Sequence, residues 1–174
     1  MKFVLVLVLL SINFAFAQQK GIHFEKELTC NEIKEKAKQE NKYIFLNGHT
    51  TWCIPCKEME LRVFLNSDIA SFFNENFINV SVQFDESKND SRLIRNWYKT
   101  ADSIKKVYEI SSYPTYLFFN PDGQLVHKIL GANLEPKEFL QKAKLALNPA
   151  TQYSVLKVQF DKCKRDTSFL RVLI

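Results

Sequence analysis

The sequence predicts an α/β domain in which a mixed β-sheet is flanked by helices. An apolar run of strand length at 43–47 leads directly towards a pair of cysteines. The segment 77–84 alternates apolar and polar residues, which is the period of a half-buried strand. Two further apolar runs, 116–119 and 124–130, are joined by the turn sequence Pro121-Asp122-Gly123, and this arrangement predicts a β-hairpin.

Helices are predicted before, between and after these strands. Thr29 and Glu32 have the spacing of a capping box, so a helix is expected to begin there and to run to about Glu40. Apolar residues recur at intervals of three and four in further segments, which predicts helices over 53–63, from 66 onward and over 136–147.

The segment 86–101 is a predicted helical insertion between two elements of the sheet. It is polar and charged, with Leu93, Ile94 and Trp97 at helical spacing. These apolar residues either cover the sheet or form a cap near the two cysteines that faces a substrate. A separate short helix is predicted over 102–108.

The first seventeen residues have the pattern of a secretory signal peptide. Lys2 gives a positive start, an apolar run follows, and Ala15-Phe16-Ala17 is a small-x-small cleavage signal. The apolar run is too short for a stable membrane span, so no membrane insertion is expected after cleavage near Ala17. The protein is therefore predicted to be periplasmic or secreted, with signal peptide 1–17 and one domain over 18–148.

Residues 149–174 lie outside this pattern of strands and helices and form a predicted helical C-terminal extension. Both 153–163 and 167–174 have helical composition, and the last residues are apolar without a helix stop signal. Three interpretations are open: a tail helix that docks on the domain, the start of a longer helical extension, or a sequence cut short at its C-terminus.

Composition excludes several classes of function. The chain has 24 basic and 19 acidic residues, but these are interspersed rather than gathered in a basic stripe, so no nucleic-acid partner is predicted. Only four glycines are present, which argues against a glycine-rich nucleotide loop. No paired-carboxylate or Ser-His-Asp arrangement stands out, and neither a cofactor nor a metal is predicted.

The four cysteines fall into two kinds. Cys53 and Cys56 would close a ring of only four residues, which constrains the unfolded chain very little and suits reversible opening better than a structural role. They are therefore predicted to form a redox-active disulfide. Cys30 and Cys163 are either buried free thiols or a long-range bridge, and the sequence does not decide between these.

The position of the two close cysteines predicts their roles. Cys53 stands at the start of a predicted helix, where unpaired N–H groups and the helix dipole stabilise a thiolate, so it is the candidate nucleophile. Cys56 lies one turn later on the same side and is the candidate resolving thiol, expected to be the more buried of the two. Pro55 suits the first turn, where its missing N–H costs nothing. Trp52 either shields the pair and offers an apolar contact surface or simply packs.

His49 lies four residues before the first of these cysteines. A cluster of one histidine and two cysteines could bind copper or zinc. No fourth ligand is evident, however, and a redox role already explains the cysteines.

Two stretches of the chain share a recognisable pattern. They are Trp52-Cys53-Ile54-Pro55-Cys56-Lys57 and the later Tyr113-Pro114-Thr115, which is followed by a hairpin with Gly123 and Gly131. Together they resemble the thioredoxin superfamily. The resemblance covers about residues 22–147. It is strongest to exported thioredoxin-like proteins of the Bacteroidetes and to the C-terminal thioredoxin-like domain of the transmembrane thiol reductant transporter of Gram-negative bacteria.

The resemblance implies a thioredoxin-like fold and further site residues. Pro114 is expected to follow a cis peptide bond and to lie against the dithiol. The backbone of Tyr113 is expected to pair with an extended substrate in the manner of strand addition. Lys57 and Thr115 belong to the same motifs and are expected to support the site.

Two positions depart from the family's pattern. In thioredoxins a buried Asp lies six residues before the first cysteine and handles the proton of the second, and here that position is Asn47, which can hydrogen-bond but cannot titrate. The proton relay must then use water or another residue such as Glu58, or be slower. Ile54 stands where Gly is common. No His lies between the cysteines, unlike in strongly oxidising members, which favours a reductase over an oxidase.

The predicted function is therefore that of a thiol-disulfide oxidoreductase that exchanges protein disulfides outside the cytoplasm. It is expected to act as a reductase, so that electrons pass to the substrate. Its expected partners are disulfide-containing proteins and a membrane thiol reductant that resets the oxidised pair. Two alternatives are open. One is a thiol reductase for cytochrome c maturation. The other is a non-catalytic thioredoxin-fold module that binds or chaperones a partner through Trp52, Tyr113 and the 91–99 helix.

Overall fold

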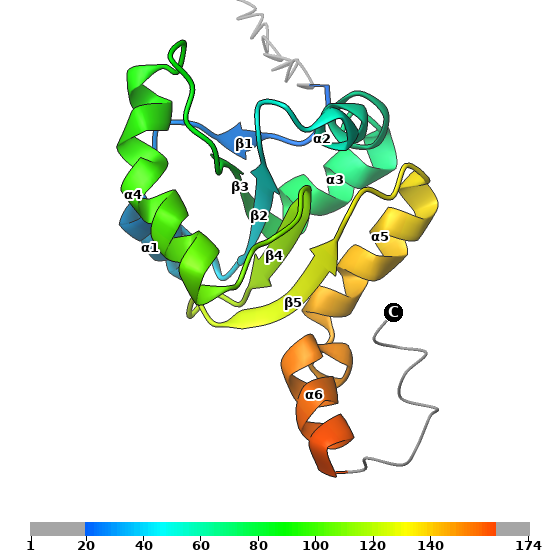
Figure 1. The fold of residues 1–174 in the computed structure, drawn as a ribbon. Coiled ribbons are helices and arrows are strands. Elements are labelled where there is room, and N and C mark those ends of the chain that lie inside the picture. The colour runs from blue at the N-terminus through cyan, green and yellow to red at the C-terminus, as the bar shows by residue number, and fades with distance from the viewer. Residues whose placement is uncertain (1–19, 163–174) are drawn as a thin grey trace, which may run out of the picture.

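The computed structural model describes residues 20–162 of the chain, so the predicted signal peptide, Cys163 and the predicted helix over 167–174 lie outside the described residues. A five-stranded sheet has the order β1-β3-β2-β4-β5 (Figure 1). The three strands β1, β3 and β2 are parallel, whereas β4 and β5 are antiparallel to their neighbours. The predicted mixed sheet is confirmed. The strands are β1 (Phe24–Glu25), β2 (Tyr43–His49), β3 (Phe77–Gln83), β4 (Thr115–Phe119) and β5 (Leu125–Leu130).

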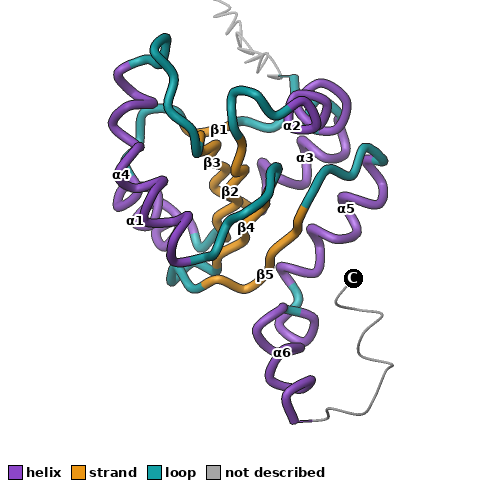
Figure 2. Tube along the Cα trace, in the orientation of Figure 1, coloured by secondary structure: helices purple, strands orange, loops and turns teal. Residues whose placement is uncertain are grey.

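Helices cover both faces of this sheet (Figure 2). One apolar cluster lies between the sheet and α1 and α4. A second lies between the sheet and α3, α5 and the segment Met59–Val63 that follows α2. The sixth helix, α6, lies beyond the sheet, after α5. The bounds are α1 (Cys30–Glu40), α2 (Ile54–Glu58), α3 (Ser67–Asn76), α4 (Arg92–Val107), α5 (Pro136–Lys144) and α6 (Tyr153–Lys162).

The first predicted helix begins where its capping box places it. The backbone N–H of Glu32 donates to Thr29 Oγ1 at 3.4 Å, and the backbone N–H of Thr29 donates to Glu32 Oε2 at 2.7 Å. This reciprocal pairing satisfies two N–H groups that a helix start leaves free. The hydrogen bonds also lower the pKa of the Glu32 carboxyl, because they favour its charged form.

The helical insertion differs from its prediction. Instead of one helix over 86–101 and a second over 102–108, the chain forms the single helix α4, which begins six residues later than the predicted insertion. Ser91 caps its start, since Ser91 Oγ accepts from the backbone N–H of Ile94 at 3.3 Å. Ala101 and Ile104 continue the apolar face without a Gly or Pro to interrupt it, so the helix has no reason to stop at residue 101. Its apolar face packs on the sheet, which is the simpler of the two interpretations.

Two further elements escaped the sequence prediction. The two-residue strand β1 pairs with Asn79 and Val80 of β3 and is too short to show any period. The predicted helix over 53–63 is α-helical only to Glu58, because Met59–Val63 form a π-helical turn in which the backbone N–H of Phe64 donates to the carbonyl of Met59 at 2.9 Å. The wider turn lets the consecutive residues Val63 and Phe64 both be buried.

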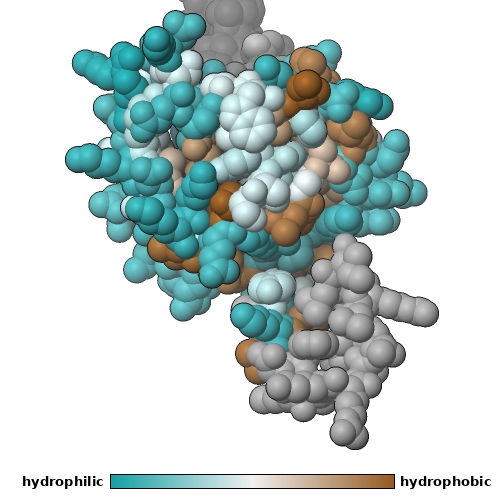
Figure 3. All heavy atoms as spheres, viewed as in Figure 1, coloured by the Kyte–Doolittle hydropathy of each residue, from teal (hydrophilic) through white to brown (hydrophobic). Residues whose placement is uncertain are grey.

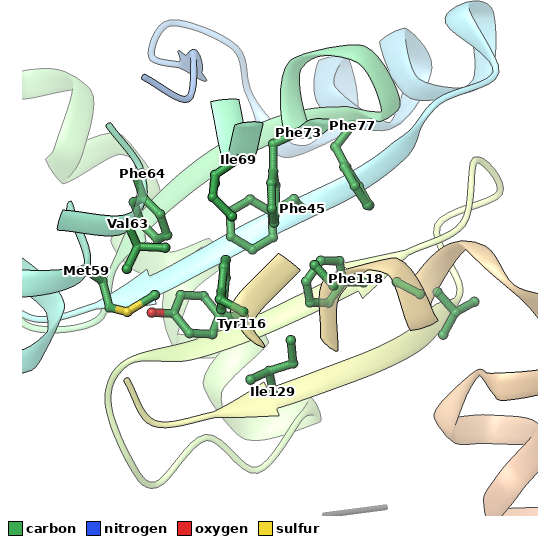
Figure 4. Close-up of a cluster of buried hydrophobic side chains, with 14 residues drawn as sticks. Phe45, Met59, Val63, Phe64, Ile69, Phe73, Phe77, Tyr116, Phe118 and Ile129 are labelled. Carbon is green, nitrogen blue, oxygen red and sulfur yellow. The ribbon is translucent and has the colours of Figure 1, made fainter. Parts of the chain in front are cut away.

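The core between the sheet, α3 and α5 is built largely from aromatic rings (Figure 4). Phe73 lies at its centre, with its ring centroid 4.5 Å from that of Phe45, 5.2 Å from that of Phe77 and 5.7 Å from that of Phe139. Offset and edge-to-face contacts of this kind add to the free energy gained from burying the rings. This core supports the helix that carries the two close cysteines.

The start of the tail forms the predicted helix. In α6, Leu156 is buried, and Gln152 Nε2 donates to the carbonyl of Ala146 at 3.0 Å just before the helix begins. Cys30 carries a free, half-buried thiol, so of the two interpretations the free thiol holds for this residue. Within residues 20–162, no helix combines the length and the apolar character needed to cross a bilayer.

His127 on β5 is expected to make the fold less stable in mild acid. Burial lowers the pKa of its imidazole to about 4, although a backbone hydrogen bond with Lys142 partly opposes this shift. Between the ordinary pKa of about 6.5 and that value, the unfolded chain binds a proton that the folded chain does not, so stability falls as the pH falls. Going from pH 7 to pH 5 should cost about 2 kcal/mol.

Denaturant unfolding of the wild type and of His127→Phe at the two pH values measures this effect. The free energy lost on acidification should be smaller in the variant by about the amount given above. An equal loss in both proteins would show that His127 is not the group responsible.

A closed dithiol at a helix start

Cys53 and Cys56 form a disulfide in the structure, with an S–S distance of 2.01 Å and Cα atoms 5.3 Å apart. They lie where the loop after β2 enters α2. Cys53 is the N-cap of this helix, and Pro55 stands in its first turn, as predicted. The predicted pair of neighbouring sulfurs is thus present at a junction between a strand and a helix.

The start of α2 directs a hydrogen-bond donor at the first sulfur. The backbone N–H of Cys56 donates to Cys53 Sγ at 3.2 Å. A donor in this place, together with the partial positive charge of a helix N-terminus, stabilises negative charge on that sulfur when the disulfide opens. The expectation that Cys56 is the more buried is wrong for the closed pair, because Cys53 is 2% exposed and Cys56 is 3% exposed.

Aromatic side chains lie beside the dithiol. Trp52 is 67% exposed, but its indole ring lies edge-on to the ring of Tyr113, with centroids 6.0 Å apart. The Tyr113 ring stacks in turn on Phe84 at 5.8 Å. The peptide bond between Tyr113 and Pro114 is cis, as the resemblance implied. Trp52 therefore both packs and presents an apolar surface, which combines the two interpretations of this residue.

Thr115 and Gly48 hold the strands beneath the site close together. Thr115 is fully buried, and its Oγ1 donates to the carbonyl of Ser112 at 2.7 Å. Gly48 is opposite Thr115 in the pairing of β2 with β4. A Cβ atom at Gly48 would lie 2.8 Å from the Phe84 ring and 2.9 Å from the Thr115 carbonyl, so this position has no room for a side chain. This crowding could not be predicted from the sequence, because it arises only when β2, β4 and the end of β3 come together.

The predicted relay position is buried and uncharged. Asn47 is 2% exposed, and its Nδ2 donates to Ser81 Oγ on β3 at 3.3 Å. Lys57 and Glu58 are both exposed on the outer side of α2. Glu58, the alternative relay named from the sequence, therefore lies on the wrong side of its helix to serve a buried sulfur.

Two features that precede the dithiol could not be predicted from the sequence, one in the loop before it and one at the end of β2. The backbone N–H of Thr51 donates to Asp85 Oδ1 at 2.9 Å and its hydroxyl donates to the other carboxylate oxygen, which ties this loop to the end of β3. Burial lowers the pKa of the half-buried His49, although the carboxylates of Glu60 and Asp85 partly oppose this.

Among the described residues, no group of three or more His, Cys, Asp or Glu side chains could hold a metal ion.

Comparison with known proteins identifies the family. The family model of the thioredoxin-like domain matches residues 30–147. Mitochondrial thioredoxin-3 of Saccharomyces cerevisiae is 30% identical over 129 residues, which cover 70% of this chain and 86% of the yeast protein. The solution structure of a candidate disulphide isomerase from Bacteroides thetaiotaomicron has a TM-score of 0.60 at 33% identity, covering 76% of this chain and 98% of that one.

A third relative bears on the predicted likeness to the thiol reductant transporter. The thiol:disulfide interchange protein DsbD of Actinobacillus pleuropneumoniae is 26% identical over 132 residues, which are 74% of this chain but 21% of that protein. The chain therefore spans about a fifth of the length of this relative. The predicted resemblance is confirmed, and the chain belongs to the thioredoxin-like domain family of thiol-disulfide oxidoreductases.

Proposed function

We propose that the protein reduces protein disulfides outside the cytoplasm, with Cys53 as the nucleophile and Cys56 as the resolving thiol. The observation that carries this proposal is the hydrogen bond from the Cys56 backbone N–H to Cys53 Sγ, 3.2 Å long, at the start of α2. The two sulfurs therefore have different surroundings, because Cys53 Sγ accepts a hydrogen bond from a backbone N–H at the start of the helix. A thiolate so stabilised is both the attacking species and a good leaving group.

The proposed cycle is an exchange through a mixed disulfide. The Cys53 thiolate attacks one sulfur of a substrate disulfide, forming a bond to it while the substrate's other sulfur leaves as a thiolate. Cys56 loses its proton and attacks Cys53 Sγ, which forms the Cys53–Cys56 bond and releases the second substrate sulfur. Two electrons pass to the substrate, and a dithiol donor must return them before the next turnover.

The leader pattern supports a place outside the cytoplasm. Residues 1–17, which lie outside the described residues, have the order of charge, apolar run and small-residue cleavage signal that export requires. In that compartment the electron donor is proposed to be a membrane thiol reductant. The catalytic unit is proposed to be 18–148, with 149–174 as a tail.

Contact with a substrate is proposed to involve the apolar surface beside the dithiol. Trp52 and Ile54 flank Cys53 and are 67% and 70% exposed. On the face seen in Figure 3, pale and brown residues lie towards the middle and hydrophilic residues surround them. Trp52, Ile54 and the backbone of Tyr113 are proposed to hold the substrate segment next to its disulfide, with Pro114 and Thr115 fixing the Tyr113 backbone in place.

Reduction of insulin disulfides by the protein, with dithiothreitol as the electron donor, tests the proposal. Cys53→Ser should lower the rate to that of dithiothreitol alone, since serine cannot form the mixed disulfide. Cys30→Ser is the matched control and should keep the wild-type rate, because the Cys30 thiol lies away from the site at the start of α1. Wild-type activity in Cys53→Ser would remove this residue from the mechanism. Partner capture that survives in Cys53→Ser/Cys56→Ser would favour the binding module instead.

A further inference from the structure

Two adjacent residues at the end of β3 contact both of the loops that form the site. The carboxylate of Asp85 accepts two hydrogen bonds from Thr51, one from its backbone N–H at 2.9 Å and one from its hydroxyl. The ring of Phe84 stacks on that of Tyr113, with centroids 5.8 Å apart. Thr51 lies two residues before Cys53, and Tyr113 belongs to the loop with the cis peptide bond. The end of β3 therefore joins the loop before the nucleophile to the loop expected to meet the substrate backbone.

Phe84 is held firmly in place by β2. Its backbone N–H donates to the carbonyl of His49 at 2.9 Å, directly after the last paired residues of the two strands. Its side chain is buried and lies against Gly48, where a Cβ atom would come within 2.8 Å of the ring. A ring packed this closely has little freedom to move. The Tyr113 ring therefore rests on a neighbour that is fixed to the sheet.

A cluster of hydrogen bonds around Asp90 holds Asp85 in turn. Gln83 Nε2 donates to the backbone carbonyl of Asp85 at 2.9 Å and to Asp90 Oδ2 at 2.7 Å. The same oxygen of Asp90 accepts from the backbone N–H of Ser87 at 2.9 Å and from the hydroxyl of Tyr98, on α4, at 2.5 Å. These bonds, that from Tyr98 foremost, lower the pKa of the buried Asp90 carboxyl, so the acceptor is charged and the bonds are strong. A continuous chain of hydrogen bonds thus runs from α4 to the loop before the dithiol.

The proposed reaction depends on how the two loops lie relative to each other. The backbone of Tyr113 is proposed to hold an extended substrate segment while Cys53 Sγ attacks the disulfide next to it. Such an attack is fast only when the reacting atoms are close and aligned, and a small displacement of either partner slows it. The path from Thr51 to Cys53 is short, and the Cys53 N–H donates to the Thr50 carbonyl at 3.2 Å. A shift at Thr51 would therefore be passed on to the nucleophile.

We propose that Asp85 is a positioning residue for disulfide exchange, which acts through Thr51 to keep Cys53 aligned with a substrate segment that lies along Tyr113. The cluster around Asp90 supports this role by fixing Asp85 to α4. This inference rests on the proposed function. It follows that disulfides within a polypeptide depend on Asp85 more strongly than small disulfides do, because only the former use both loops.

The test compares two disulfides in single turnover with the reduced protein. One joins two extended peptides through cysteine, and the other is hydroxyethyl disulfide, which has no backbone to pair with Tyr113. The rate at which the Cys53–Cys56 bond forms is measured by acid quenching and alkylation of the remaining thiols. Asp85→Ala should slow the reaction with the peptide disulfide by about 10-fold and leave the rate with the small disulfide nearly unchanged. Glu86→Ala is the matched control, because it removes the carboxylate of the exposed next residue, and it should keep both rates.

Two further variants separate positioning from folding. Asp85→Asn keeps an oxygen that can accept from the Thr51 N–H, so it should recover most of the lost rate. Thr51→Ala removes the hydroxyl but keeps the backbone bond, so its loss should be smaller than that in Asp85→Ala and confined to the peptide disulfide. Should Asp85→Ala not fold, this selective loss in Thr51→Ala supports the inference, and unchanged rates in Thr51→Ala overturn it.

Three results in folded variants would overturn the inference. They are a wild-type rate with the peptide disulfide in Asp85→Ala, equal losses with the two disulfides, and a loss in Asp85→Asn as large as that in Asp85→Ala. Failure of the proposed function is distinct from these, since it would appear as wild-type turnover of both disulfides by Cys53→Ser.

Discussion

Replacing Cys56 by Ser is expected to stop repeated turnover and to leave Cys53 covalently attached to substrate. The donor to Cys53 Sγ is the backbone N–H of residue 56, which the substitution leaves in place, so the Cys53 thiolate still forms and attacks. The second step cannot follow, because a serine hydroxyl does not displace the substrate sulfur. Insulin reduction should fall to the uncatalysed rate.

Non-reducing gels and mass spectrometry of cell extracts would reveal the trapped complexes. Attached proteins identify the substrates, and an attached membrane protein identifies the electron donor. An apocytochrome among them would support the role in cytochrome c maturation. The double variant Cys53→Ser/Cys56→Ser should trap nothing, and repeated turnover by Cys56→Ser would contradict the assigned order of the two sulfurs.

Phe73→Ala is expected to lower the free energy of unfolding by about 3–5 kcal/mol, the range for large-to-small changes at well-packed sites. Phe73 is fully buried and contacts rings from β2, α5 and the start of β3, so its loss leaves a cavity that these rigid neighbours cannot close. Since domains of this size are stabilised by about 5–15 kcal/mol, such a loss is a large part of the total.

Urea unfolding followed by tryptophan fluorescence measures this loss. Phe72→Ala is the matched control, because it removes the same ring one residue earlier, where the side chain is only half-buried. Its loss should be less than half as large. Equal losses in the two variants would show that burial at Phe73 is not the cause.

The sequence predicted those features that depend on residues close together in the chain. The capping box at Thr29, the strand before the dithiol and the hairpin after Pro114 all follow from local chemistry and are present. The cis bond at Pro114 was predicted only through the resemblance to a family. Without that pattern a single proline gives no reason to expect it.

Features that depend on distant contacts were missed. The strand β1 is held by Asn79, whose Nδ2 donates to the carbonyl of His23 at 3.2 Å, and by Phe24, which packs near Phe45 and Phe64. His49 lines a cavity with the first turns of α4, and the carboxylates of Glu60 and Asp85 act on it, only when the π-helical turn, the loop after β3 and α4 have come together. A two-residue strand and an isolated histidine have no period of their own to detect.

The two outer strands of the sheet have a consequence for how the protein meets unfolded chains. On one side β1 spans only two residues, and on the other the pairing of β5 is interrupted by an irregularity between Phe118 and Phe119. A short or bulged edge strand offers few backbone groups for pairing with another chain, and this protects the protein from co-aggregation. Under the proposed function, unfolded substrates would then be held through the mixed disulfide with Cys53 and released when that bond is exchanged.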